Sequence, residues 1–236
     1  MKIKNNIVFF SLMIVISITN AHAIFEGGWG SGGGKAVVCF DSPKIAEIVQ
    51  KTEGVISSQY LSNITYMETL DLFHARNVVG ETQIHRVAAN ESYVEFLDRM
   101  IQKIQVIDPF FAREIIKSKN EFNKRIIGFK HGPVDPTHDE NYAEFQFVDQ
   151  CVLTNVAVQK WDEGMNGYRL HIDTRLFNHI RFSEESKATL MLHEYLYQVA
   201  REKGERDSKS TRDLISAVLT DSPDINLKEY ITEFGF

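Results

Sequence analysis

Residues 145–176 read FQFVDQCVLTNVAVQKWDEGMNGYRLHIDTRL and contain the clearest strand pattern of the chain. The apolar run over 145–159 predicts a strand at the centre of a sheet, and the strict alternation over 168–176 is typical of a half-buried strand. The segment 162–167 between them contains two glycines and predicts an antiparallel hairpin. In the second strand we expect Leu170 and Ile172 on the buried face, and Arg169, His171 and Asp173 on a solvated face.

Helical patterns dominate the rest of the chain. Ser92 and Glu95 form a capping box that predicts a helix to about residue 106, and Asp108-Pro109 predicts the start of a second helix that ends near residue 127. Further predicted elements are a strand at 36–40, an ambiguous segment at 65–73, and helices at 183–203 and 210–219. With no linker and no repeat, these patterns predict one α+β domain over 36–236, with an antiparallel sheet packed against helices and a helical C-terminal third.

The first 23 residues have the three parts of a secretory signal peptide. Lys2 and Lys4 precede a twelve-residue apolar run over 7–18, and Ala21-His22-Ala23 supplies small residues at a cleavage site. The run is shorter than the ~20 residues that cross a bilayer, so we expect cleavage rather than stable membrane insertion. We therefore expect export to the periplasm or the exterior, with a flexible glycine-rich segment over 24–35 before the domain.

Charge excludes some classes of partner. Cleavage after residue 23 removes two of the 26 basic residues and none of the 32 acidic residues, which leaves a net charge of −8. An acidic surface does not suit nucleic acid, so a protein or an envelope component is the expected partner. The glycine-rich segment lacks the spacing and the final Ser or Thr of a phosphate-binding loop.

Export would place Cys39 and Cys151 in an oxidising compartment, which favours a disulfide over two buried thiols. The bridge would close a loop of more than a hundred residues, which is worth about 4–5 kcal/mol in the chain-entropy model. Two cysteines are too few for a structural zinc site of their own.

The segment 188–197 resembles the active-site helix of the zincin metallopeptidases. His193 and Glu194 match the first two positions of His-Glu-x-x-His, where two histidines bind zinc and the glutamate activates water. Tyr197 stands in place of the second histidine and removes a ligand. The resemblance implies a divergent zinc-dependent hydrolase in which His193 is a metal ligand and Glu194 is the general base. His193 would need two further ligands, which His171 and Asp173 on one face of the strand, or the loop over 131–140, could supply.

A helical wheel favours a simpler interpretation. Glu194 falls on a polar stripe with Lys187, Gln198 and Arg201, and His193 lies at the border of the apolar arc. On this interpretation Glu194 is a solvated residue, His193 is a helix-edge histidine, and no cofactor is expected. Zinc belongs to the alternative interpretation only.

Asp207, Ser208 and Arg212 form a second polar group. A nucleophilic Ser208 would need a Gly-x-Ser-x-Gly turn, which is absent. We therefore expect Asp207 or Ser208 to cap the next helix, and Arg212 to form an ion pair with Glu194 or Asp207.

Taken together, these features resemble a group of small exported bacterial proteins without an assigned activity. The resemblance rests on the glycine-rich start at 27–34, Val37-Val38-Cys39, the His-Glu-x-x-Tyr segment at 193–197, Gly204, and Asp207-Ser208 with Arg212. It implies export and a single domain, and it implies no substrate. We expect a non-catalytic binding or interaction protein, with the zinc hydrolase as the alternative.

Overall fold

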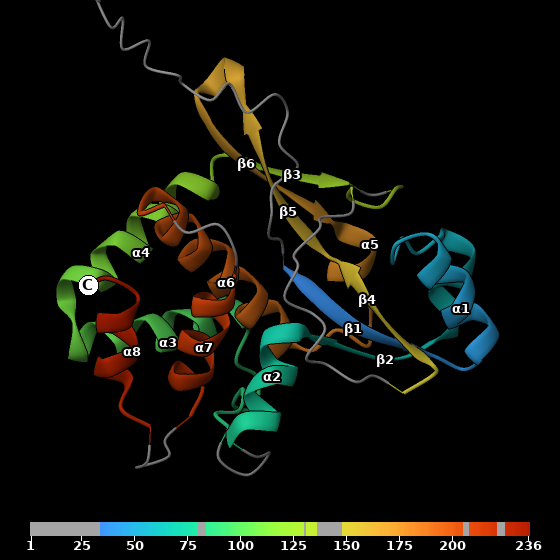
Figure 1. Cartoon of the computed structure of the whole chain (residues 1–236), viewed down its shortest axis with the longest axis horizontal. Coiled ribbons are helices and arrows are strands. Elements are labelled where there is room, and N and C mark those ends of the chain that lie inside the picture. Colours follow the sequence, from blue (N-terminus) through green and yellow to red (C-terminus); the bar gives the residue numbers. More distant parts are fainter. Residues whose placement is uncertain (1–33, 80–83, 130, 136–147, 205–207, 221–224) are drawn as a thin grey trace, which may run out of the picture.

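The computed structural model describes residues 34–79, 84–129, 131–135, 148–204, 208–220 and 225–236 (Figure 1). The predicted signal peptide and most of the glycine-rich segment lie outside these residues, as does Asp207. Within the described residues the protein has the predicted α+β class, with strands packed against helices. The strands form two small sheets rather than one, and the second sheet contains a parallel pair. No helix of the described residues is long and apolar enough to cross a membrane.

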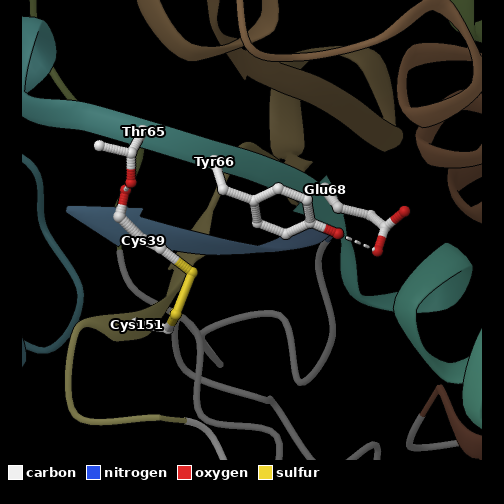
Figure 2. The surroundings of a disulfide bond; sticks show 5 residues. All are labelled: Cys39, Thr65, Tyr66, Glu68 and Cys151. Atoms are coloured by element: carbon white, nitrogen blue, oxygen red, sulfur yellow. Dashed lines mark hydrogen bonds between the residues drawn. A yellow bond between two sulfur atoms is a disulfide. The ribbon is translucent and has the colours of Figure 1, made fainter. Parts of the chain in front are cut away.

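The first sheet is antiparallel and has the strand order β2-β1-β4. The central strand β1 covers Lys35–Phe40, flanked by β2 at Ile64–Thr69 and β4 at Cys151–Asn155. Cys39 lies directly opposite Cys151, and the two residues form the predicted disulfide (Figure 2). On the other side of Cys39, the Thr65 hydroxyl donates to the Cys39 carbonyl oxygen at 3.2 Å. The disulfide thus joins two neighbouring strands that are 112 residues apart in sequence.

The second sheet is mixed and has the order β3-β6-β5. Strand β5 (Ala157–Asp162) and strand β6 (Gly167–Asp173) form the predicted hairpin, and β3 (Ile126–Phe129) pairs with β6 in parallel. The 3₁₀ turn Glu163–Met165 closes the hairpin.

Residues 145–147 of the long strand predicted over 145–159 lie outside the described residues. The described part is not one strand, because β4 begins only at Cys151 and is divided from β5 at Val156. The backbone N–H groups of Val156 and Ala157 both donate to the Gly34 carbonyl oxygen, at 2.9 and 3.1 Å. The chain bends there and passes from the first sheet into the second. The bend depends on Gly34, more than a hundred residues away in sequence, so local periodicity could not indicate it.

Two predicted element ends are also wrong. Strand β6 ends at Asp173, which is fully buried rather than solvated because its carboxylate caps the short helix α5 (Thr174–Phe177) and pairs with the Arg175 guanidinium. Helix α4 (Pro109–Phe122) ends five residues early, because the chain enters β3 at Ile126. The ambiguous segment 65–73 contains both possibilities: β2 passes directly into α2 at Leu70.

The helix starts follow the sequence closely. Helix α3 (Tyr93–Ile107) begins at the Ser92–Glu95 capping box, and Asp108 caps α4. Helix α6 (Glu184–Glu202) begins at Ser183 and ends before Gly204, whose φ is +96°. The remaining helices are α1 (Pro43–Lys51), a 3₁₀ helix at Ser58–Asn63, α2 (Leu70–Val79), α7 (Lys209–Val218) and α8 (Leu227–Glu233).

Helix α6 lies at the centre of the molecule. It packs against α2, α3, α4 and α7 and also against β2 and β5 (Figure 1). All its residues from Ala188 to Tyr197 are buried. Because helices and strands enclose this part of α6 on several sides, they cover its apolar arc and also His193 and Glu194, which therefore lie inside the protein.

Candidate functional site

His193 and Glu194 project from α6 toward different elements. The Nδ1 atom of His193 lies 2.8 Å from Oδ1 of Asp71, in the first turn of α2, and both side chains are buried. Glu194 points instead toward the start of β1 and toward β5, where it contacts Gly34 and Gln159. We call Gly34, Asp71, Gln159, His193 and Glu194 the α6 polar cluster.

Asp71 is the ionisable residue of the cluster that the sequence did not predict. It lies in the segment 65–73, where the pattern did not distinguish a strand from a helix. Because β2 passes into α2 without a loop, Asp71 lies in the first turn of α2, where it faces α6. The one local signal at Asp71 is that an acidic residue is favourable in the first turn of a helix.

The Asp71–His193 pair fixes the orientation of the imidazole. Burial lowers the pKa of His193, but the charge of Asp71 and its hydrogen bond outweigh burial and raise this pKa above its usual value. Within the described residues, Nε2 of His193 is buried and has no hydrogen-bond partner, and the same holds for Oε1 of Gln159. The cluster therefore leaves two polar atoms unsatisfied.

Glu194 is fully buried, so the prediction of a solvated residue is wrong. Its Oε1 accepts a hydrogen bond from the Gly34 backbone N–H at 2.6 Å, and its Oε2 accepts one from Gln159 Nε2 at 2.9 Å. Burial raises the pKa of the Glu194 carboxyl, and these two donors and His193 oppose the shift. Both carboxylate oxygens are therefore engaged by the protein itself.

Gly34 and Lys35 belong to the fold rather than to a flexible segment. Both are buried, and Lys35 is the first residue of β1. The Gly34 N–H donates to Glu194 while its carbonyl oxygen accepts from β5, so this residue joins α6 to the bend between the sheets. The segment 24–35 that was predicted to be flexible therefore contains two residues that are part of the fold.

The structure does not gather the three predicted metal ligands. His171 stacks on Phe129 with ring centroids 5.3 Å apart, and burial with the cations of Lys160 and Arg169 lowers its pKa. The Asp173 carboxylate is held by Arg175. Among the described residues, no group of three or more His, Cys, Asp or Glu side chains is placed to hold a metal ion.

Tyr197, the residue in place of the second zincin histidine, is fully buried beside His193, with ring centroids 6.0 Å apart. Its ring is also 5.4 Å from the guanidinium carbon of Arg201. Tyr197 therefore lies between the imidazole of His193 and the guanidinium of Arg201.

Ser208 and Arg212 lie close to the cluster, at the start of α7. Ser208 occupies the N-cap position, but its hydroxyl makes no capping bond and instead accepts from Arg212 Nη1 at 2.8 Å. Arg212 is buried, and its charge lowers the pKa of His193. The expected ion pair of Arg212 with Glu194 does not form, since Glu194 uses Gly34 and Gln159, and the alternative partner Asp207 lies outside the described residues.

No known protein family, curated protein or solved structure matches this chain. The function must therefore be argued from the arrangement of its own residues.

A substitution of Gly34 by alanine tests the contact between Gly34 and the middle of α6. An added Cβ would lie 2.0 Å from Leu190 Cδ1 and 2.7 Å from Glu194 Oε1, so α6 or β1 would have to shift. We expect Gly34→Ala to lower the free energy of unfolding by roughly 1–3 kcal/mol, the usual effect of overpacking. Chemical denaturation measures this, with Gly132→Ala, where the added Cβ meets nothing within 4 Å, as the matched control. Equal stability of the two variants would contradict the close packing at Gly34.

The raised pKa of His193 predicts a pH dependence of stability. A group whose pKa is raised by folding stabilises the protein fully below its unfolded value, here 6.5, and loses this contribution as the pH rises through its folded pKa. The urea midpoint of the wild type should therefore exceed that of Asp71→Asn most at pH 6 and less at pH 9. The pKa of Glu194 is also raised, and the largest cause of that shift is burial, which is common to both proteins. A difference that stays constant over this pH range would show that His193 does not titrate as described.

Proposed function

We propose that the chain is exported, and that its mature part is a non-catalytic binding protein of the cell envelope or the exterior. The basic start, the apolar run over 7–18 and the small residues at 21–23 support export. The disulfide between Cys39 and Cys151 is compatible with an oxidising compartment.

One observation carries the non-catalytic assignment. A general base must reach the proton of a water molecule or a substrate. Glu194, the residue that would have this role in a zincin-like enzyme, is fully buried, and each of its oxygens already accepts a hydrogen bond from the protein. Its role on this proposal is to hold β1 and β5 against α6.

A second candidate function rests on the unpartnered Nε2 of His193. In zinc enzymes a carboxylate commonly holds one imidazole nitrogen of a histidine while the other nitrogen binds the metal. Asp71 and His193 have the first half of this arrangement. The divergent zinc hydrolase therefore stays as the competing proposal, with Nε2 as one ligand.

Hydrolysis assays separate the two proposals. The probe is fluorescently labelled casein, incubated with the mature protein and with Glu194→Gln, each with and without added zinc. We expect no turnover above the protein-free blank under any condition. Hydrolysis by the wild type that is abolished in a folded Glu194→Gln variant would overturn the non-catalytic proposal.

Fractionation of cells that express the full chain tests export. We expect the protein in the periplasm or the medium, with Ile24 as its first residue. Full-length protein retained in the cytoplasm would contradict the export part of the proposal. The hydrolysis assay would still test the non-catalytic part.

A further inference from the structure

The β5–β6 hairpin extends beyond the helices, at the top of the view in Figure 1. Its tip is held by its own contacts: the Asp162 carboxylate accepts from the Met165 N–H at 3.0 Å and pairs with Arg169 at 2.5 Å. Asn166 adopts the left-handed conformation that the turn requires, with φ of 46°. The hairpin therefore presents its side chains on a fixed support.

A row of aromatic rings with one cation connects this hairpin to α6. The guanidinium carbon of Arg201 lies 3.7 Å from the ring centroid of Tyr168 and 5.4 Å from that of Tyr197. Tyr168 in turn meets Trp161 edge to face, with centroids 5.1 Å apart. The row begins at the fully buried Tyr197 and ends at Trp161, whose exposed fraction is 52%.

Trp161 is the exposed end of this row and has an apolar neighbour at the tip, Met165, with an exposed fraction of 39%. Tryptophan, tyrosine and arginine are the residues that contribute most to binding at protein interfaces. A rigid, exposed tryptophan offers a large apolar area at a small loss of conformational entropy on binding.

Arg201 has no anionic partner among the residues that the structure describes. The partly buried guanidinium contacts the two tyrosine rings and, within the described residues, forms no ion pair; its Nη1 is buried without a hydrogen-bond partner. On the same turn of α6, Gln198 Oε1 is also buried and unpartnered. By contrast, Arg175 pairs with Asp173 and Arg169 with Asp162. Because partly buried charges are normally paired, Arg201 is suited to a carboxylate supplied by a ligand.

We infer that Trp161, Tyr168 and Arg201 form a binding site for a protein partner, which presents a peptide carboxylate next to an aromatic or large apolar side chain. The carboxylate pairs with the guanidinium of Arg201, and the apolar group packs on Trp161 and Met165. This inference rests on the proposed binding function and gives it a surface and a ligand class. Charge complementarity selects a carboxylate, since Arg201 has hydrogen-bond donors only and carries a positive charge.

A matched pair of small probes tests the site. N-acetyl-phenylalanine carries the carboxylate, and N-acetyl-phenylalanine amide is its neutral equivalent. The readout is the indole N–H signal of Trp161 in two-dimensional NMR. The signal of Trp29, the other tryptophan of the chain, is the internal reference. We expect a saturable shift of the Trp161 signal with the acid, with a Kd on the order of 1 mM as for other fragments, and a much smaller shift with the amide.

Variants separate binding from folding. We expect Arg201→Gln to weaken binding of the acid by about tenfold or more. Trp161→Ala, a change at an exposed position, should abolish binding without lowering the melting temperature, as followed by ligand-observed NMR. Arg113→Gln is the control, because Arg113 also stacks on an aromatic ring, that of Phe110 at 5.5 Å, but lies on another surface.

Three results would overturn the inference. The first is the absence of a saturable Trp161 shift, and the second is equal shifts for the acid and the amide. The third is binding of a neutral sugar such as chitohexaose that Trp161→Ala abolishes and Arg201→Gln leaves unchanged, which would assign the site to a glycan. None of these results bears on hydrolysis by Glu194 or on export, so the proposed function is judged separately.

Discussion

Replacement of Asp71 by alanine is expected to lower the free energy of unfolding by about 3–5 kcal/mol, the usual effect of removing one partner of a buried charged pair. The Asp71 carboxylate is buried and holds Nδ1 of His193 at 2.8 Å. Without it both imidazole nitrogens would be buried and unsatisfied, because Nε2 already has no partner. Urea denaturation at pH 6, where the pair contributes most, measures the loss.

The matched control is Asp98→Ala. Asp98 also pairs with a cation from another helix, Lys119, but its side chain is 46% exposed, so we expect a loss of about 0–1 kcal/mol. Asp71→Asn should be intermediate, since an amide oxygen can still accept from Nδ1 but carries no charge. A loss for Asp71→Ala no larger than that for Asp98→Ala would show that the pair does not stabilise the fold.

Removal of the disulfide should have a comparable effect. Cys39 and Cys151 are 112 residues apart, and the chain-entropy model assigns about 4–5 kcal/mol to a loop of this length. The double variant Cys39→Ala/Cys151→Ala should therefore unfold at a markedly lower urea concentration than the oxidised wild type. In the wild type the bridge also fixes β4 beside β1. We expect the unfolding of the double variant to remain a single transition.

Reduction of the wild type provides the control, because it breaks the bridge without changing the side chains around it. The reduced wild type and the double variant should have similar midpoints. If the double variant is as stable as the oxidised protein, the bridge contributes nothing and its link to export is weakened.

The elements that could be predicted from the sequence are those with local causes. The capping box at Ser92, the Asp108-Pro109 start and the turn over 162–167 each specify their element within a few residues, and all three are confirmed. The ends of α4 and β6 depend on which segments pair with them in space, and the sequence misplaced both. The division of the strand at Val156 depends on the Gly34 carbonyl oxygen, which no local pattern reveals.

The contacts of the α6 polar cluster also depend on residues that are distant in sequence. The wheel placed Glu194 on a polar stripe, and the stripe is real, since Gln198 and Arg201 on it are partly exposed. Burial at Glu194 arises because β5 and Gly34 cover that part of α6 and supply hydrogen-bond donors. Asp71 was missed since its side chain meets His193 across 122 residues of sequence. His193 and Glu194 could be predicted as candidate groups, but their partners could not.

The central claim is that the α6 polar cluster stabilises the fold and does not hold a catalytic zinc ion. The most direct test is the zinc content of the purified mature protein, measured together with its melting temperature before and after chelation. A structural cluster without metal predicts zinc far below one ion per chain and a melting temperature that chelation leaves unchanged. One zinc ion per chain, lost on chelation with a fall in the melting temperature and absent from His193→Gln, would contradict the claim and favour the hydrolase.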